Sequence, residues 1–243
     1  MDEHKSGPET AWQTFQRIVS NRRAIRDFDG RAIDEAALKD VLQEALSAPT
    51  SGNIQPYQFH WVRDPELKAR VAAACNGQKA ASSASTLVVV TAAGRTAARS
   101  LESLDALLAR SALPPRSLAY HGNNHKILRR FLRFAPWSVF GVLRVLLSFF
   151  VPRLSLLPIG PAGTTQWFAR NSIYAAQTFL LAAAARGFDT CPMEGFDAMK
   201  VGRLLDLPRG SVISLVIAVG HRREDARLEP RLRRSFDEAV VVH

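Results

Sequence analysis

Two short, almost wholly apolar runs constrain the fold more than any other feature of this 243-residue chain. TLVVVTA (86–92) and SVISLVIAVG (211–220) are rich in β-branched residues and too short for a typical helix, so each predicts a buried strand. YQFHWVR (57–63) alternates apolar and polar residues and predicts a third strand, and the apolar tail AVVV (239–242) could add another. Longer helical patterns separate these runs, which is typical of one α/β or α+β domain.

Helical periodicity marks the remaining segments. Residues 10–21 form one amphipathic pattern, and Asp34 is placed to cap a second helix that ends before Pro49. Asp64 and Asp197 are expected to begin two more helices. The strongest helical pattern lies in residues 169–188, where Gly187 is expected to cap the C-terminal end of the helix. The apolar faces predicted for the first, second and last of these patterns are Trp12, Phe15, Ile18 and Val19; Leu38, Val41, Leu42, Ala45 and Leu46; and Ile173, Gln177, Leu180, Leu181 and Ala184.

One region does not fit a small compact domain. Residues 126–163 are rich in Leu, Phe, Val and Pro with interspersed Arg, so we treat about 110–165 as an insertion. It could be a lid over a site, a dimer arm, or an element that contacts a membrane surface through residues 126–160. Pro136 and Arg144 disfavour a spanning helix, whereas Arg129, Arg130 and Arg133 beside apolar residues suit an anionic lipid surface.

The chain is strongly basic, with 32 Lys and Arg against 22 Asp and Glu and a net charge of +10. Such a balance suits nucleic acid, an anionic membrane or an anionic ligand, but no nucleic-acid motif is present, so we predict no nucleic-acid partner. Its two cysteines build neither a disulfide framework nor a zinc site. His121 and His125 lack a third ligand nearby, so no metal site is predicted. With no signal peptide, a reduced cytoplasmic protein is expected.

The polar residues that could carry function lie in four short segments. They are RRAIRDF (22–28), APTSGNIQPYQF (48–59), CPMEGFD (191–197) and EPRLRR (229–234). In this order they resemble the nitroreductase family of flavin mononucleotide (FMN) proteins, with its patterns R-[RH]-[ST]-x-[RK]-x-F and A-P-[ST]-[SG]-x-N-x-Q-P-[WY]-x-F, a proline-containing segment after a long Ala-rich helix, and a basic pair near the C-terminus. The resemblance covers about residues 12–100 and 165–240.

The resemblance implies an architecture. It is a helix-rich α+β fold, a three-layer α/β/α arrangement around a central, mostly antiparallel sheet. Residues 1–243 would form a single FMN-binding domain that carries the insertion at about 110–165. The resemblance also implies a homodimer with two shared sites.

The same resemblance assigns the phosphate end of the site. Arg22, Arg231 and Arg233 match the family's phosphate positions, and Arg234 competes with Arg233 for the last of them. Arginine's planar fork suits phosphate, because it donates two parallel hydrogen bonds. Arg23 and Ala24 lie beside Arg22 in the cofactor-binding segment, where Ala24 replaces a residue that commonly carries a hydroxyl group.

The ring end of the site is implied in the same way. Arg26 matches a cation near flavin N1 and the C2 carbonyl, where reduction leaves negative charge. Either Asn76 or Gln78 would meet the pyrimidine edge. Backbone N–H groups of Glu194 or Gly195 would point at flavin N5. Further cofactor contacts are expected from Pro192 and Met193, and, across the dimer interface, from Ser51, Asn53 and Gln55.

The implied function is oxidoreduction. Electrons from NAD(P)H would pass through FMN to a nitroaromatic, a quinone or a similar electron-poor small molecule. No catalytic side chain is predicted, because the cofactor carries the chemistry. The alternative is a flavin-binding or flavin-processing member of the same superfamily without nitroreductase activity.

Overall fold

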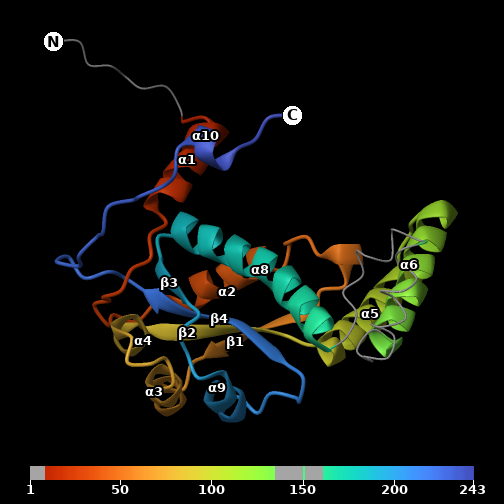
Figure 1. The fold of residues 1–243 in the computed structure, drawn as a ribbon, viewed down its shortest axis with the longest axis horizontal. Coiled ribbons are helices and arrows are strands. Elements are labelled where there is room, and N and C mark those ends of the chain that lie inside the picture. Colours follow the sequence, from red (N-terminus) through yellow and green to blue (C-terminus); the bar gives the residue numbers. More distant parts are fainter. Residues whose placement is uncertain (1–8, 135–149, 151–160) are drawn as a thin grey trace.

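A four-stranded sheet forms the centre of the molecule (Figure 1). The computed structural model describes residues 9–134, 150 and 161–243. Strands β1 (Tyr57–Val62), β2 (Thr86–Ala92), β3 (Asp189–Met193) and β4 (Val212–Gly220) lie in the order β1-β2-β4-β3, and all neighbours are antiparallel. The three strands expected from the apolar runs are confirmed within one residue at each end, whereas β3 was not expected.

Helices cover both faces of this sheet. On one face, α2 (Glu35–Ala45) and α8 (Pro161–Ala185) pack on Val88, Val90, Ile217 and Val219. On the other face, α3 (Pro65–Ala73), α4 (Lys79–Ser83) and α9 (Ala198–Leu204) pack on Leu87, Val89, Val216 and Ala218. Successive strand residues point to opposite faces, so each central strand is buried on both sides. The expected three-layer α/β/α architecture is confirmed (Figure 1).

The expected helix starts are confirmed by their caps. The side chains of Asp34, Asp64 and Asp197 accept hydrogen bonds from backbone N–H groups in the first turns of α2, α3 and α9. The face predicted for α8 is partly wrong, because Ile173 is 41% exposed while Phe179 is fully buried. Ala175, Ala176 and Ala183 share that burial, so small residues, rather than the largest ones alone, let α8 approach the sheet.

The first helix and the C-terminal segment lie beside one another, away from the sheet (Figure 1). The helix α1 (Ala11–Asn21) has no buried residue, and Trp12 and Phe15 of its predicted apolar face are 65% and 47% exposed. The strand expected in the tail is wrong: residues 236–239 form the short helix α10 (Phe236–Ala239). Val241 and Val242 after it are exposed.

The expected insertion contains a pair of helices that projects from one end of the molecule (Figure 1). The pair consists of α5 (Gly94–Ala109), which lies entirely before the expected start at about residue 110, and α6 (Pro115–Phe134), which lies within the expected insertion. Residues 135–149 and 151–160, where most of the lid, dimer-arm and membrane expectations fall, lie outside the described residues. Within the described part of the chain, no helix is long and apolar enough to cross a membrane.

Candidate functional site

The segment that follows α1 runs along the edge strand β3. Ala24 forms a parallel bridge with Thr190, and the N–H of Ile25 donates to the Thr190 carbonyl at 3.0 Å. Ile25 is 1% exposed, whereas its neighbours Ala24 and Arg26 are exposed, as expected for extended backbone. This alternation turns Arg22, Ala24 and Arg26 away from the core.

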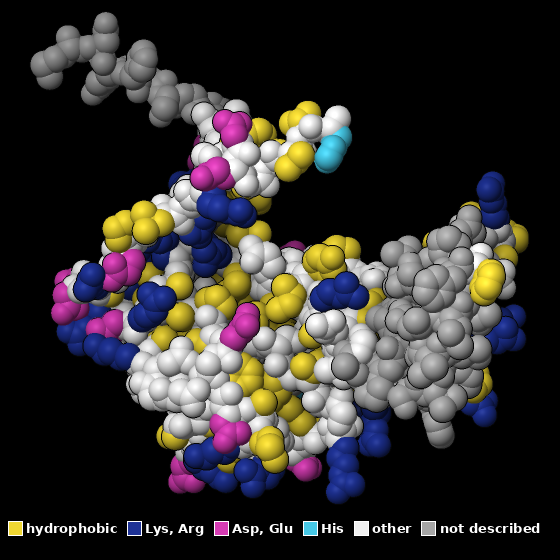
Figure 2. Space-filling model, in the orientation of Figure 1, with side chains coloured by type: hydrophobic (Ala, Val, Ile, Leu, Met, Phe, Trp, Pro, Cys, Tyr) yellow, Lys and Arg dark blue, Asp and Glu magenta, His cyan; other side chains and the backbone are white. Residues whose placement is uncertain are grey.

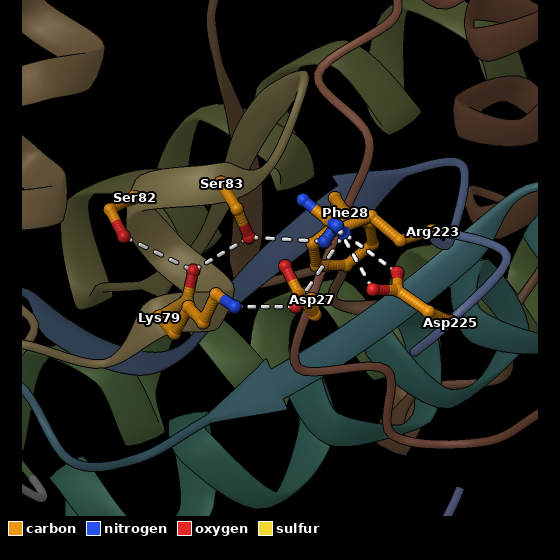
Figure 3. A network of polar contacts seen from close by, with 7 residues as sticks. All are labelled: Asp27, Phe28, Lys79, Ser82, Ser83, Arg223 and Asp225. Carbon is orange, nitrogen blue, oxygen red and sulfur yellow. Dashed lines mark hydrogen bonds and ion pairs between the residues drawn. The ribbon is translucent and has the colours of Figure 1, made fainter. Parts of the chain in front are cut away.

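A polar network fixes the far end of this segment (Figure 3). Asp27 pairs with Lys79 of α4 at 2.5 Å and lies 3.9 Å from Arg223, which also pairs with Asp225. The N–H of Phe28 donates to the Ser83 hydroxyl at 3.1 Å. These contacts connect the N-terminal segment to α4 and to the chain that leaves β4. The N-terminal and C-terminal parts of the site are therefore fixed by the same network.

Arg231 joins the C-terminal segment to the end of α1. Its guanidinium donates to the carbonyls of Val19 (3.1 Å), Ser20 (2.9 Å) and Arg22 (3.1 Å). The last carbonyls of a helix have no partner within the helix, and a basic side chain is a favourable one. Arg23 adds a second link, because its guanidinium donates to the Glu229 carbonyl.

These links bring three arginines together around one cavity of about 460 Å³. Arg22, Arg231 and Arg233 line it, and none of the described lining residues is Asp or Glu. Burial, and then the charges of Arg231, Arg233 and Arg23, lower the pKa of Arg22. A bound anion in this cavity would offset the repulsion among the arginines and so favour the charged form of Arg22. The other lining residues are Phe15, Val19, Gln177, Leu180, Leu181 and Pro192.

Cys191 is buried and directly precedes Pro192, which lines the cavity. Burial raises the pKa of the Cys191 thiol, and the nearby charges of Arg26 and Arg22 partly oppose that rise. Arg26 therefore stands near β3 on the same side as Arg22. The thiol stays neutral at ordinary pH, so this cysteine offers no thiolate to the site.

The segment after β3 supplies backbone groups next to the cavity. Gln78 donates from Nε2 to the Gly195 carbonyl at 2.6 Å. The Asp197 N–H donates to the Ala74 carbonyl at 2.8 Å. Glu194 and Gly195 are exposed, and neither of their N–H groups donates to any other described residue. A side chain at position 195 would press on Gln78, because a Cβ there would lie 3.2 Å from its Nε2.

Gln78 and Asn76, the two residues expected at the pyrimidine edge, differ in their contacts and backbone conformation. Gln78 contacts the segment at Gly195, whereas Asn76 is exposed and has a positive φ of 52°, followed by Gly77 at 69°. Asn76 therefore shapes the turn after α3. Met193 is 3% exposed and belongs to the core, so its side chain points away from the exposed surface.

The loop that contains Ser51, Asn53 and Gln55 is not part of the arginine cavity. The Ser51 N–H donates to Oδ1 of Asn171 at 2.7 Å, near the middle of α8, whereas Gln177 and Leu181 further along the helix line the cavity. Ten residues separate Asn171 from Leu181, which is about 15 Å of helix. Within one chain, the loop and the arginines thus lie at different parts of α8.

Several residues of the site were not expected from the sequence. Asn171 and Ser100 hold the loop, and Phe15, Val19 and Gln177 line the cavity. Gln177 offered a signal, since it interrupts an apolar helical face. The buried Asn171 gave none. Among the described residues, no group of three or more His, Cys, Asp or Glu side chains could hold a metal ion.

The three-layer arrangement of helices around an antiparallel sheet, with an arginine-lined cavity next to β3, places the chain among α+β proteins. The sequence profile described as "Nitroreductase family" matches residues 19–221, and the chain belongs to this family.

Three relatives illustrate the likeness. The chain is 30% identical over 224 residues to Protein DrgA of Synechocystis sp., covering 91% of this chain and 89% of that protein. It is 23% identical to a putative NAD(P)H nitroreductase, MhqN, of Bacillus subtilis, covering 93% and 97%. A putative nitroreductase from Exiguobacterium sibiricum, solved in complex with FMN, superimposes with a TM-score of 0.69 at 20% identity, covering 94% of this chain and 97% of that one. The NAD(P)H-linked names among the relatives support an oxidoreductase.

Proposed function

We propose that this chain is a single-domain FMN-dependent oxidoreductase, which passes electrons from NAD(P)H to electron-poor small molecules such as nitroaromatics or quinones. The observation that carries the proposal is the cavity lined by Arg22, Arg231 and Arg233 without a carboxylate. Three converging guanidinium groups suit a phosphate with nearly two negative charges. FMN supplies the electron-transfer chemistry when it is bound, and the protein positions it.

The residues around the cavity fit the rest of that cofactor. Pro192 connects the cavity to Glu194 and Gly195, whose exposed N–H groups would donate to the ring, and Gln78 lies beside them. Arg26, near Cys191, would place a fixed positive charge beside the pyrimidine edge. Arg23 and Ala24 would serve as backbone and packing partners, because Arg23 is bonded to the Glu229 carbonyl and Ala24 is paired with Thr190.

We further propose that two copies form a homodimer and that each contributes its 51–55 loop to the site of the other. Support comes from apolar side chains left exposed around the cavity: Trp12 and Phe15 on α1, Tyr174 on α8, and Leu232 and Phe236 in the C-terminal segment. Exposed aromatic and large aliphatic side chains are enriched at protein–protein interfaces. Sedimentation equilibrium tests this proposal, and a monomer that still binds FMN would contradict it.

A cytoplasmic location completes the proposal. Cys75 and Cys191 are both free and buried, which suits a reducing compartment.

The test compares FMN with riboflavin, which lacks the phosphate. Titration of the flavin-free full chain should show that FMN binds more tightly than riboflavin, and that Arg22→Met removes most of this difference. Arg209→Ala, an exposed arginine away from the cavity, is the matched control. Equal affinity for both flavins in the unaltered protein would overturn the phosphate assignment. NAD(P)H oxidation that stays slow with nitroaromatics and quinones would favour a flavin-processing protein.

A further inference from the structure

The outer face of α6 carries an exposed apolar stripe. Tyr120, Ile127 and Phe134 follow one another at intervals of seven residues and are 63%, 64% and 45% exposed. Residues seven apart lie almost above one another on a helix, so the three side chains form a line of about 20 Å. Leu107 at the end of α5 and Leu113 in the following turn are also exposed, at 64% and 40%.

The same helix is basic and contains no acidic residue. Of its five cations, Arg129 turns toward α5, where it pairs with Asp105. The other four, Arg116, Lys126, Arg130 and Arg133, are exposed and form no ion pair with another described residue. By helical spacing, Arg116 falls within the stripe, and Lys126, Arg130 and Arg133 follow one side of it. The guanidinium of Arg133 lies 5.4 Å from the centre of the Phe134 ring.

The inner face of α6 is held firmly, so the stripe is presented in a fixed direction. His125 is 3% exposed, and its Nδ1 lies 2.5 Å from Oδ1 of Asp105. Phe131, which by helical spacing borders the stripe next to Ile127, contacts Trp167 of α8 edge to face, with ring centres 5.0 Å apart. Contacts with α5 and α8 therefore fix the orientation of α6. Figure 2 shows apolar and basic side chains next to one another along the outer edge of the α5–α6 projection.

We propose that the outer face of α6 docks on a phospholipid surface that carries net negative charge. Exposed apolar residues interleaved with cations let a helix bury its stripe at the boundary of headgroups and acyl chains while its cations contact lipid phosphates. A second copy fits this face less well, because a twofold contact would set four unpaired cations against four more. Nucleic acid fits less well too, because a phosphate backbone gives the apolar stripe nothing to bury against.

Vesicle co-sedimentation of the full chain tests the proposal. The probes are phosphatidylcholine vesicles with and without phosphatidylglycerol. We expect binding only to the anionic vesicles, weakening as salt is added. Each cation near such a surface strengthens binding by roughly fivefold, so the triple variant Lys126→Ala, Arg130→Ala, Arg133→Ala should bind at least about tenfold more weakly. The matched control removes three exposed cations elsewhere: Lys39→Ala, Lys200→Ala, Arg209→Ala.

Ile127→Asn tests the apolar part separately, and Tyr120→Asn replaces it if that variant fails to melt cooperatively. Either should weaken binding without changing the net charge, and bound flavin should be unaffected. Four results would overturn the proposal. They are equal binding to neutral and anionic vesicles, an equal loss in the control triple variant, dissociation of a dimer by Ile127→Asn, and duplex DNA binding that depends on the three cations alone.

Discussion

The backbone N–H of Ser51 donates a 2.7 Å hydrogen bond to Oδ1 of Asn171, a side chain that is only 2% exposed. Asn171 also donates from Nδ2 to the Trp167 carbonyl at 2.8 Å, which fixes the direction of its amide. The buried amide of Asn171 thus joins α8 to the surface loop, which the Ser100 hydroxyl also holds by donating to the Gln55 carbonyl. The loop contains positive φ angles at Gly52, Asn53 and Gln55, which fold stably only where the surroundings hold them.

Asn171→Ala should therefore release the loop. We expect a loss of about 1–3 kcal/mol in the free energy of unfolding, because the Ser51 N–H loses its acceptor in a partly buried setting and Asn171 is itself buried. Hydrogen exchange at the Ser51 amide should become much faster. Asn123→Ala, at an exposed position on α6, is the control and should change neither quantity. Unchanged exchange at Ser51 in the Asn171 variant would show that another contact holds the loop.

Gly52→Ala should destabilise the same loop in two ways. The residue has φ of 60°, and a Cβ there would lie 2.9 Å from Cδ1 of Leu128 on α6. Gly30→Ala is the matched control, because Gly30 has φ of 77° with nothing within 4 Å of its added Cβ. The control should lose about 1–2 kcal/mol from backbone strain alone, and Gly52→Ala should lose more. Combining Gly52→Ala with Leu128→Ala should recover the excess, and strictly additive losses in the double variant would exclude the steric contact as its cause.

Arg22→Met should separate stability from ligand binding. The lowered pKa of Arg22 shows that burial and the neighbouring arginines disfavour its charge, so the flavin-free variant should be as stable as the unaltered protein or more stable, by ~0.5 kcal/mol after allowance for solvent screening. Affinity for FMN should fall about 10- to 100-fold with the loss of a charge-assisted hydrogen bond. Thermal melting with and without inorganic phosphate measures the first effect, and fluorescence titration the second. A variant that is markedly less stable without ligand would mean that Arg22 has a structural role.

Arg231→Lys should have the opposite profile. Lysine keeps the positive charge but cannot reproduce the guanidinium that bridges the carbonyls of Val19, Ser20 and Arg22. We expect the end of α1 to fray, with a loss of about 1 kcal/mol, while the preference for FMN over riboflavin persists. Hydrogen exchange across α1 and paired flavin titrations measure the two effects. Unchanged hydrogen exchange across α1 in this variant would show that the guanidinium of Arg231 does not stabilise the end of the helix.

His60 should make the stability of the fold depend on pH. Burial lowers the pKa of His60, whose Nε2 lies 3.0 Å from the Thr91 hydroxyl. The unfolded chain therefore takes up a proton near its ordinary value of 6.5, at a pH where the folded chain does not. Stability should fall as pH drops below about 6.5, until the folded pKa is reached. Urea unfolding at several pH values should show that His60→Gln loses this part of the dependence, whereas the exposed control His243→Asn keeps it.

How far the sequence predicts this structure depends on how local each signal is. The strands β2 and β4 and the capped starts of α2, α3 and α9 follow from residues close together in the chain. The strand β3 has five residues, includes Pro192, and lies at the sheet edge, where proline is tolerated, so its sequence shows no strand pattern. The burial of α8 was missed because Ala176 and Ala183 face the sheet, while the larger Ile173 and Tyr174 do not.

The sequence predicts which arginines belong to the site, but it does not predict the contacts that position them. The expectation that Arg22, Arg231 and Arg233 could meet came from a family resemblance, and the structure lines one cavity with all three. What each of them binds stays a prediction. The role of Arg231 at the end of α1 needs the three-dimensional path of the tail, which no local pattern contains.

The bond from Arg231 to the Arg22 carbonyl spans 209 positions of the chain. During synthesis, α1 and the segment after it leave the ribosome long before Arg231 and Arg233 are translated. The nascent protein therefore cannot assemble the three-arginine cavity until Arg233 has left the ribosome. A ligand that depends on this cavity can bind only after that point, and it would hold together two segments whose translation is separated by 209 positions.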